Sequence, residues 1–274
     1  NGLRRLRDLF GDPLLVRTSD GMKPTERAEM LQPMVRDVLA SVEKAVEPSQ
    51  EFDAAAADRV FRISVSDYTE STLLPHLMRR LRSEAPNITL DVLTPSDISY
   101  QDVEQGTVDL VINRFDVLPQ SFHQMTVWRD TFSCLLSHHN PIVNNFNLDS
   151  YLDSGHVWVN KTGMGVGVGM EPGATKTLGW VDEALFSIGK QRRIRVFTRH
   201  YQAAMRLAEL RDLIVTLPTK AARLLADNPN VVIFDPPFSI PEIELKMAWS
   251  PLVQHNPAHQ WIRRLIADVA KKLD

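Results

Sequence analysis

Strand-like and helix-like segments alternate along most of the chain, and this alternation restricts the fold more than any other feature. RVFRISV (residues 59–65) alternates apolar and polar side chains, whereas residues 67–86 carry leucines at helical spacing, Leu73, Leu77 and Leu81, up to Pro86. NITLDVL (87–93) and TVDLVIN (107–113) are the next predicted strands, with a short helix between them. Strands that alternate with helices predict an α/β fold with a parallel sheet.

A second alternating set follows from residue 155 onward. Its predicted strands are GHVWVN, RIRVFT, DLIVTLP and NVVIFD, and its predicted helices are TLGWVDEALFSIG, QAAMRLAELR and TKAARLLAD. The final strand IELKMAWSP and the final helix, capped by Asn256, are expected to return to the first lobe. Two α/β lobes joined by crossing strands form a cleft, and open α/β sheets bind ligands beyond the carboxyl ends of their strands.

The first 24 residues have a different organisation. Leu3, Leu6 and Phe10 recur at helical steps beside a basic face, and Asp20-Gly21 is a hairpin-turn signal between two short strands. Helix and hairpin together predict a winged element. The helix lacks a strong cap and a short isolated helix is marginal in water, so we expect further chain before Asn1.

A long second helix is predicted from Thr25, which is a suitable N-cap. Its apolar residues follow the three-four spacing of a coiled-coil seam, and they include Leu31, Val35, Val38 and Val42. One alternative is a helix packed on its own domain. We favour a dimerisation helix, because the opposite face is charged and EPSQEFDAAAAD reads as a linker.

Composition sets limits on the compartment and on the partners. Cys134 is the only cysteine, which rules out a disulfide within one chain and favours a reducing compartment. No apolar run approaches the ~20 residues of a membrane span, so no membrane partner is expected. A net charge of −3 leaves nucleic acid open as a partner, because a small basic module can lie within an acidic chain.

The order of wing, long helix and two-lobed α/β module resembles the LysR-type transcriptional regulators. The resemblance is carried by LRRLRDLFGDPLLVRTSDGMKPTERA, then by FRISVSDYTESTLLPHLMRRLRSEAPNITLDV, GTVDLVI and DLIVTLP, and it covers essentially the whole chain. The segment EFDAAAADRVFRISVSD is most similar to the branch with regulators of aromatic degradation, nodulation and efflux. The first segment matches the end of a recognition helix, the wing and the start of the linker.

The resemblance implies a partial winged helix-turn-helix and a linker helix, followed by a periplasmic-binding-protein-like effector domain. The expected boundaries are 1–24 for the DNA-reading part, 25–58 for the dimerisation helix and hinge, and 59–274 for the effector domain. Lobe I is expected at about 59–133 and 237–274, and lobe II at about 134–236. The expected partners are promoter DNA, a small effector and further copies of the chain, as a dimer or tetramer.

Four basic residues are the DNA-contact candidates: Arg4, Arg5, Arg17 and Lys23. Arg4 and Arg5 also fit a solvated helix face, whereas Arg17 matches the wing arginine of the family. Asp20 departs from the family, because wings commonly carry a second basic residue there and a carboxylate repels phosphates. Lys23 is the nearby charge that compensates for it.

The effector-site candidates follow the ends of the predicted strands. They are Ser66, Asp67, Thr94, Ser96, Asn113, Asn160, Thr162, Arg199, His200 and Thr216. Hydroxyl groups and helix-start amides suit a carboxylate or phenolate, and Arg199 and His200 add charge-assisted bonds. The resemblance places His200 where aromatic-acid-sensing relatives carry a histidine, the alternative being a structural histidine at a strand end. Asp67 either lies at the cleft mouth, where it repels anions, or caps the next helix.

Other motifs predict neither a cofactor nor a metal. TGMGVGVGMEPGATK never forms the GxGxxG or GxxxxGK[ST] pattern, and we interpret it as a flap over the cleft. His138 and His139 are adjacent, so on a strand they point to opposite faces. The basic run from Lys190 to Arg195 is expected at a solvated edge, and Cys134 is expected to be a small buried hydrophobe.

Three functions are therefore compared. The first is a transcription regulator gated by a small aromatic or carboxylate inducer that alters oligomer geometry at the promoter. The second is the solute-binding protein of a transporter, which shares the two-lobed cleft but needs an export signal and no wing. The third is an enzyme, which ranks lowest because the cleft positions form no acid–base pair at a readable spacing, so no catalytic residue is assigned.

Overall fold

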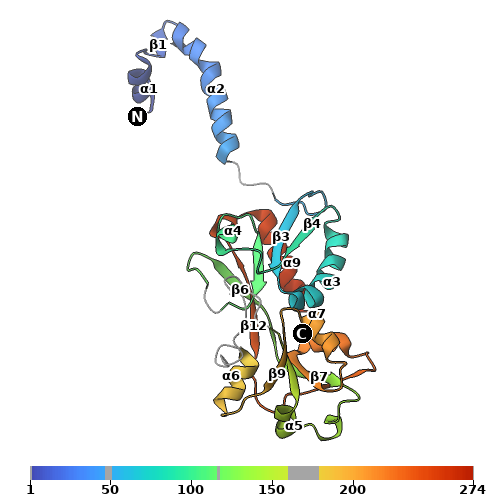
Figure 1. The fold of residues 1–274 in the computed structure, drawn as a ribbon. Helices are drawn as coiled ribbons and strands as arrows, with labels where there is room; N and C mark the ends of the chain where they lie inside the picture. The colour runs from blue at the N-terminus through green and yellow to red at the C-terminus, as the bar shows by residue number, and fades with distance from the viewer. Residues whose placement is uncertain (1, 47–50, 116–117, 160–178, 274) are drawn as a thin grey trace. The chain divides into compact units, whose positions relative to one another are not determined.

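The computed structural model describes residues 2–46, 51–115, 118–159 and 179–273. The chain divides into two compact units, Asn1–Glu51 and Phe52–Asp274, each described here by itself. Both contain helices and strands, and the larger unit holds two five-stranded sheets (Figure 1). The predicted α/β fold with a two-lobed second part is confirmed. No helix in the described ranges is long and apolar enough to cross a lipid bilayer.

The smaller unit contains a helix, a hairpin and a long helix: α1 (Gly2–Phe10), β1 (Leu15–Thr18), β2 (Gly21–Pro24) and α2 (Glu26–Val46). β1 and β2 pair in antiparallel fashion around the predicted turn, where Gly21 adopts a φ of 107° that favours glycine. The amide of Ala28 donates to the Thr25 hydroxyl at 3.1 Å, which confirms the predicted N-cap of α2. Arg7 donates to the carbonyls of Pro13 and Leu15, so its side chain fastens α1 to the hairpin.

Lobe I of the larger unit contains a mixed sheet in the order β4-β3-β5-β12-β6. β3 is parallel to β4 and β5, whereas β12 is antiparallel to β5 and β6. Its strands are β3 (Val60–Val65), β4 (Thr89–Leu93), β5 (Leu110–Asn113), β6 (His123–Asp130) and β12 (Ile243–Trp249). Its helices are α3 (Asp67–Glu84), α4 (Tyr100–Glu104), α9 (Pro257–Ala270) and the short η4 (Pro251–Val253).

Lobe II contains the second sheet, in the order β11-β7-β10-β8-β9. β8 is parallel to β9 and β10, and β7 is antiparallel to β10 and β11. Its strands are β7 (Phe132–Ser137), β8 (Gly155–Val159), β9 (Arg193–Thr198), β10 (Leu213–Pro218) and β11 (Val231–Phe234). Its helices are α5 (Leu148–Asp153), α6 (Trp180–Ser187), α7 (Tyr201–Leu207) and α8 (Thr219–Ala222), with η1 (Val143–Asn145) and η3 (Arg223–Leu225).

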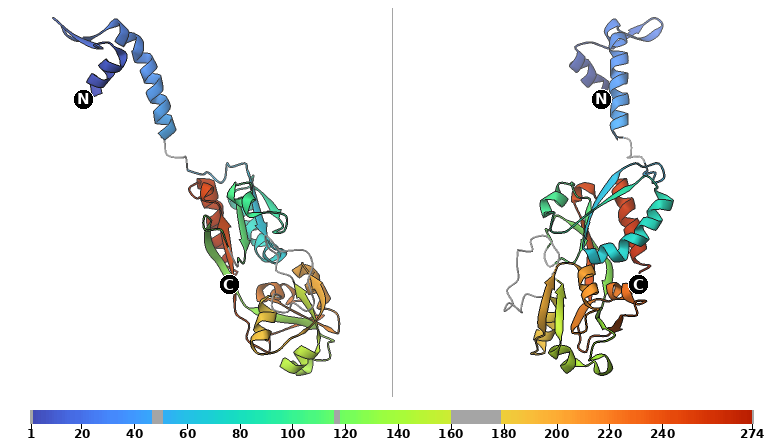
Figure 2. Two further views of the ribbon diagram at one scale, coloured as in Figure 1. Left: turned by 60° about the vertical axis from the view of Figure 1, so that its left-hand side comes forward. Right: turned by 45° about the vertical axis from the view of Figure 1, so that its right-hand side comes forward.

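The chain crosses between the lobes twice. The first crossing is short, because only Thr131 separates β6 in lobe I from β7 in lobe II. The second runs from β11 through residues 235–242 to β12 (Figure 2). Since β12 lies between β5 and β6, the end of the chain completes the sheet of lobe I.

The core of the larger unit continues through both lobes. Leu73, Leu77 and Leu81 of α3 are buried, with 3%, 2% and 0% exposure, which confirms the predicted inward face of that helix. Burying a leucine stabilises a fold by about 1.5–3 kcal/mol, so this one stripe secures α3 on the sheet. Cys134 is fully buried on β7, as expected, and burial raises the pKa of its thiol to about 12.

Candidate functional site

A cavity of about 580 Å³ lies between the two lobes. Arg114 and Phe115, which follow β5, form one wall together with Glu244 and Lys246 of β12. The facing wall is α6 of lobe II with the residues just after it. The lining from lobe II and from the second crossing consists of Trp180, Glu183, Ala184, Ser187, Ile188, Ser239, Pro241 and Glu242.

Charged and aromatic groups occur together at this cavity. The Arg114 guanidinium lies over the Trp180 ring, 4.6 Å from its centroid, and so joins the lobes by a cation–π contact. Glu244 accepts a hydrogen bond from Thr126 and lies 2.7 Å from Arg129 and 3.6 Å from Lys246. The Thr126 hydrogen bond and the two cations hold the pKa of the Glu244 carboxyl below its usual range. This wall therefore offers cations, a fixed carboxylate and an aromatic face.

A second hollow, beneath Trp180, is much smaller. At about 20 Å³ it has room for one water molecule. Phe132, Trp158, Trp180 and Tyr201 give it aromatic walls. It is therefore an extension of the aromatic surface and not a second ligand-sized space.

The polar floor of this hollow is an ion pair. Arg192 donates to both carboxylate oxygens of Asp182, at 2.8 and 2.7 Å, and the two side chains are only 2% and 7% exposed. The expectation that Arg192 lies on a solvated edge is wrong. Arg193 and Arg195, its neighbours in the basic run, are exposed. Arg192 differs from these two arginines because it pairs with a buried carboxylate, that of Asp182, which lies ten residues earlier on α6.

The predicted effector residues of lobe I lie at the ends of its strands. Ser66 is buried and caps α3, accepting a hydrogen bond from the Thr69 amide. The Asp67 carboxylate reaches across to lobe II and accepts from the Gln202 amide at 3.2 Å. Thr94 and Ser96 are exposed after β4, and Asn113 accepts from the Arg114 amide at the end of β5. Arg114, adjacent to Asn113, lines the 580 Å³ cavity.

The predicted effector residues of lobe II differ in accessibility. Arg199 and His200 are exposed between β9 and α7. Thr216 is buried, 2.8 Å from the Tyr151 hydroxyl and 3.5 Å from the Cys134 sulfur, and it borders the smaller hollow. Asn160, Thr162 and the glycine-rich segment lie outside the described residues. The structure thus brings Asp67 to the N-terminal end of α7, where His200 is the N-cap residue.

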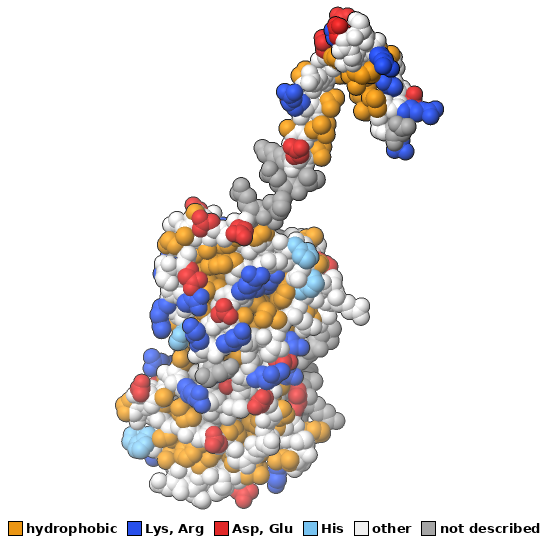
Figure 3. All heavy atoms as spheres, turned by 180° about the vertical axis from the view of Figure 1, so that it is seen from behind, with side chains coloured by type: hydrophobic (Ala, Val, Ile, Leu, Met, Phe, Trp, Pro, Cys, Tyr) orange, Lys and Arg blue, Asp and Glu red, His pale blue; other side chains and the backbone are white. Residues whose placement is uncertain are grey.

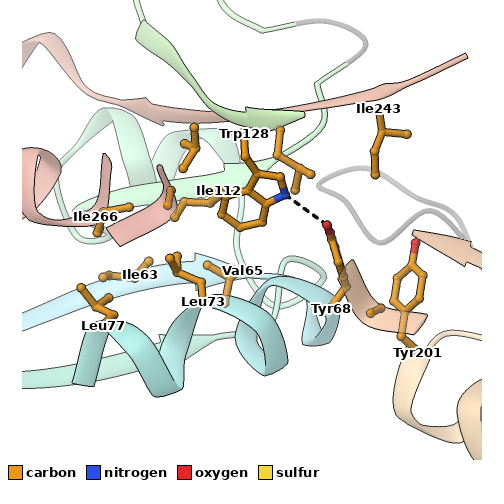
Figure 4. Close-up of a cluster of buried hydrophobic side chains, with 14 of the residues drawn as sticks. Ile63, Val65, Tyr68, Leu73, Leu77, Ile112, Trp128, Tyr201, Ile243 and Ile266 are labelled. Carbon is orange, nitrogen blue, oxygen red and sulfur yellow. Dashed lines mark hydrogen bonds between the residues drawn. The ribbon is translucent and has the colours of Figure 1, made fainter. Parts of the chain in front are cut away.

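Sequence reasoning missed a hydrogen-bonded group where the lobes join (Figure 4). The Tyr68 hydroxyl donates to Asp130 at 2.6 Å and accepts from the Trp128 indole at 3.1 Å. Asp130 also accepts from the Lys220 amide of lobe II, and the Tyr68 and Tyr201 rings lie 5.6 Å apart. Burial raises the pKa of the Asp130 carboxyl. These residues come from separate segments, so no local pattern reveals the group.

The DNA-contact candidates lie on the smaller unit. Arg4, Arg5 and Arg17 are exposed. Lys23 and Asp20 form a surface ion pair at 3.1 Å across the hairpin. This ion pair reduces the repulsion expected between Asp20 and DNA phosphates. It also occupies the Lys23 ammonium, which is itself a candidate for a phosphate contact.

The apolar seam of α2 lies largely open on this unit. Val35, Val38 and Val42 are 41%, 62% and 51% exposed, and Leu31 is half-buried. Met30, Met34 and Leu39 extend the apolar surface, and Figure 3 shows apolar side chains along this helix. An apolar row that the described residues of this unit leave exposed is typical of a helix that packs against a partner.

No group of three or more potential metal ligands was found among the residues that the structure describes. His138 and His139 lie side by side, with ring centroids 5.6 Å apart, in the turn after β7. The described lining of the cavity between the lobes contains hydrogen-bonding, cationic and aromatic groups.

Known proteins similar to this chain include several with named roles. The family described as LysR substrate binding domain matches residues 54–151. The HTH-type transcriptional activator NahR of Pseudomonas putida is 29% identical over 271 residues, covering 98% of this chain and 86% of that protein. The HTH-type transcriptional regulator LinR of Sphingobium indicum is 29% identical over 270 residues, with the same two shares covered.

A solved structure shows the same likeness in three dimensions. The regulatory domain of MexT, a transcriptional activator in Pseudomonas aeruginosa, is 30% identical to this chain with a TM-score of 0.65. The alignment covers 77% of this chain and 99% of that domain. NahR, LinR and MexT are all named for transcriptional regulation, and none of these three for transport or catalysis.

Proposed function

Since the chain belongs to the LysR family of transcriptional regulators, we propose that it binds promoter DNA and responds to a small aromatic or carboxylate effector held between the lobes. Residues 1–24 serve as the DNA-reading part, 25–58 as the dimerisation helix and hinge, and 59–274 as the effector domain. The protein acts in the cytoplasm as a homo-oligomer, and effector binding alters how that oligomer presents its DNA-reading parts.

The observation that carries the effector proposal is the cavity between the lobes. Its volume of about 580 Å³ lies within the roughly 300–1,000 Å³ of small-molecule sites. Because it is lined from both lobes, a ligand there contacts lobe I and lobe II at once. Such a ligand binds the closed arrangement better than an open one, and a ligand shifts a conformational equilibrium only through that difference in affinity.

The lining favours a flat ring with an anionic or hydroxyl substituent. Trp180 and Phe115 supply faces for a ring, while Arg114 and Lys246 supply donors for an oxygen substituent. Glu183, Glu242 and Glu244 add acceptors that suit a hydroxyl group on the same ring. The effector class is therefore a small aromatic acid or phenol.

Thermal unfolding with a panel of such compounds, benzoate and phenol among them, tests this proposal. We expect at least one member to raise the melting temperature in a concentration-dependent way. Trp180→Ala, which removes a wall of the cavity, is expected to weaken that binding at least tenfold, about 1.4 kcal/mol. Phe186→Ala is the matched control, because Phe186 lies on the same helix and is 47% exposed but does not line the cavity. Equal binding by the two variants would place the effector elsewhere.

The DNA and oligomer proposals are supported by the smaller unit. Arg4, Arg5 and Arg17 are exposed for phosphate contacts, and the seam of Leu31, Val35, Val38 and Val42 offers α2 a second copy of itself as partner. A dimer presents two wings at once. Pairing of dimers into tetramers extends this arrangement to two sites along the promoter.

Two variants of the full-length protein separate these roles. Val38→Asp places a charge in the seam, so we expect sedimentation to show dissociation of the oligomer and DNA binding to weaken. Arg17→Ala is expected to leave the oligomer intact and to reduce by about one the slope of log affinity against log salt. The measurement is fluorescence anisotropy with duplexes selected from random sequence. DNA binding that does not depend on salt would exclude a regulator of this type.

A further inference from the structure

Two hydrogen bonds near the start of α3 join the lobes directly. The Gln202 backbone amide of lobe II donates to Asp67 Oδ2 at 3.2 Å. The Gln202 side-chain amide donates to the Ser71 hydroxyl at 2.6 Å. One residue of α7 is therefore held at two points of α3, one turn apart.

The N-terminal end of α7 lacks a side-chain cap of its own. The first amides of a helix have no partner inside it, and His200, the N-cap residue of α7, supplies no side-chain cap. Gln202 lies in that first turn, so its amide requires an acceptor from elsewhere. Asp67 provides one from the other lobe and thereby acts as a cap in trans.

The helix to which Asp67 belongs does not need it in the same way. Ser66 already caps α3 through the Thr69 amide. Asp67 Oδ1 is buried and makes no hydrogen bond to any of the described residues. The Asp67 carboxylate therefore serves as a hydrogen-bond acceptor for lobe II and not as the cap of its own helix.

Other contacts near α3 and α7 also join the two lobes. Tyr68 and Tyr201, each adjacent to one of the bonded residues, pack ring against ring (Figure 4). Lys220 of α8 donates its backbone amide to Asp130 and its ammonium to the Leu273 carbonyl, beyond α9. Closing the lobes at this edge therefore buries aromatic surface and satisfies polar groups together.

We propose that Asp67, Ser71 and Gln202 form an interlobe clasp that stabilises the closed cleft before an effector binds. The clasp sets the balance between closed and open lobes in the free protein, and through it the apparent effector affinity. Its regulatory meaning rests on the proposed function. The clasp itself requires neither DNA nor effector, because all three residues belong to this chain.

Distances between spin labels in the free full-length protein test the clasp. Cysteines introduced at Arg79 of lobe I and Asp227 of lobe II carry the labels, both positions being exposed, while buried Cys134 stays unlabelled. Asp67→Ala is expected to add a longer-distance population and to raise the open-to-closed ratio roughly five- to tenfold, the effect of losing one helix cap. Gln202→Ala, which keeps the backbone amide, should shift the ratio in the same direction by a smaller factor.

Glu70→Gln is the matched control, since Glu70 also lies in the first turn of α3 but is exposed and makes no hydrogen bond or ion pair to the described residues of lobe II. Its distances should equal those of the parent. Far-UV circular dichroism verifies folding, and if Asp67→Ala fails to fold, Gln202→Ala and Ser71→Ala decide. Unchanged distances in the folded clasp variants would overturn the clasp. Because neither DNA nor effector is present, that result would leave the regulator proposal intact.

Discussion

Arg192→Ala is expected to lower the free energy of unfolding by about 3–5 kcal/mol, the largest effect of any single change considered. The substitution leaves the Asp182 carboxylate buried, at 7% exposure, without the guanidinium that neutralises it and donates to both its oxygens. An uncompensated charge in the interior costs far more than the pair contributes. Urea unfolding followed by circular dichroism measures the change.

Two further variants locate the origin of that loss. Replacing both partners, Asp182→Leu with Arg192→Met, removes the charges together and should recover most of the stability, because a well-packed apolar pair often equals a buried ion pair. Arg206→Ala breaks the surface pair with Glu209, where Arg206 is 80% exposed, and should change stability little. A loss from Arg192→Ala as small as that from Arg206→Ala would show that the pair is hydrated in solution.

Stability is expected to fall as the pH drops below about 6.5, because two buried histidines must stay neutral in the fold. Burial, with the charge of Arg192 nearby, lowers the pKa of His156 to about 3. Burial, opposed by a bond to the Asp109 carbonyl and helped by Arg263 and Arg59, lowers the pKa of His259 to about 4. His259 accepts from Arg263 through Nδ1 and donates through Nε2, so only the neutral ring satisfies both bonds.

The direction of this pH dependence follows from which state, folded or unfolded, binds protons first. Both folded pKa values lie below the unfolded value of about 6.5, so the unfolded chain takes up protons first as the pH falls. The stabilisation is complete above pH 6.5 and is lost progressively through pH 4 for His259 and towards pH 3 for His156. At pH 4 the loss is on the order of 3 kcal/mol per histidine, at 1.36 kcal/mol for each pKa unit. Burial raises the pKa of the Asp109 and Asp130 carboxyls, which opposes this trend at the acid end.

Urea unfolding at pH 7, 6, 5 and 4.5 measures this slope. His156→Gln should flatten it, because a neutral amide has no proton to bind. His76→Gln is the control, since His76 is exposed on α3. A free energy of unfolding that stays constant between pH 7 and 5 in the parent protein would contradict the prediction.

Local patterns in the sequence predict the elements of this protein well. The leucine stripe of α3, the Asp20-Gly21 hairpin and the Thr25 cap depend on residues within a few positions of one another, and all three are confirmed. Membership of the family could also be predicted from the sequence, because continuous segments carry the resemblance. The effector and DNA residues named from the sequence remain predictions.

The arrangement between the elements is what only the tertiary structure decided. Arg192 belongs to a basic run that reads as solvated, yet α6 brings Asp182 against it and buries both. Asp67 reads as a helix-start residue of α3, yet α7 makes it a cap for another lobe. The cavity behind Arg114 and Trp180 exists because the chain crosses between the lobes twice and brings those residues together. Periodicity indicates which face of an element is apolar. Partners such as Asp67 and Gln202, which are 135 positions apart, are brought together by packing, and no local pattern contains that information.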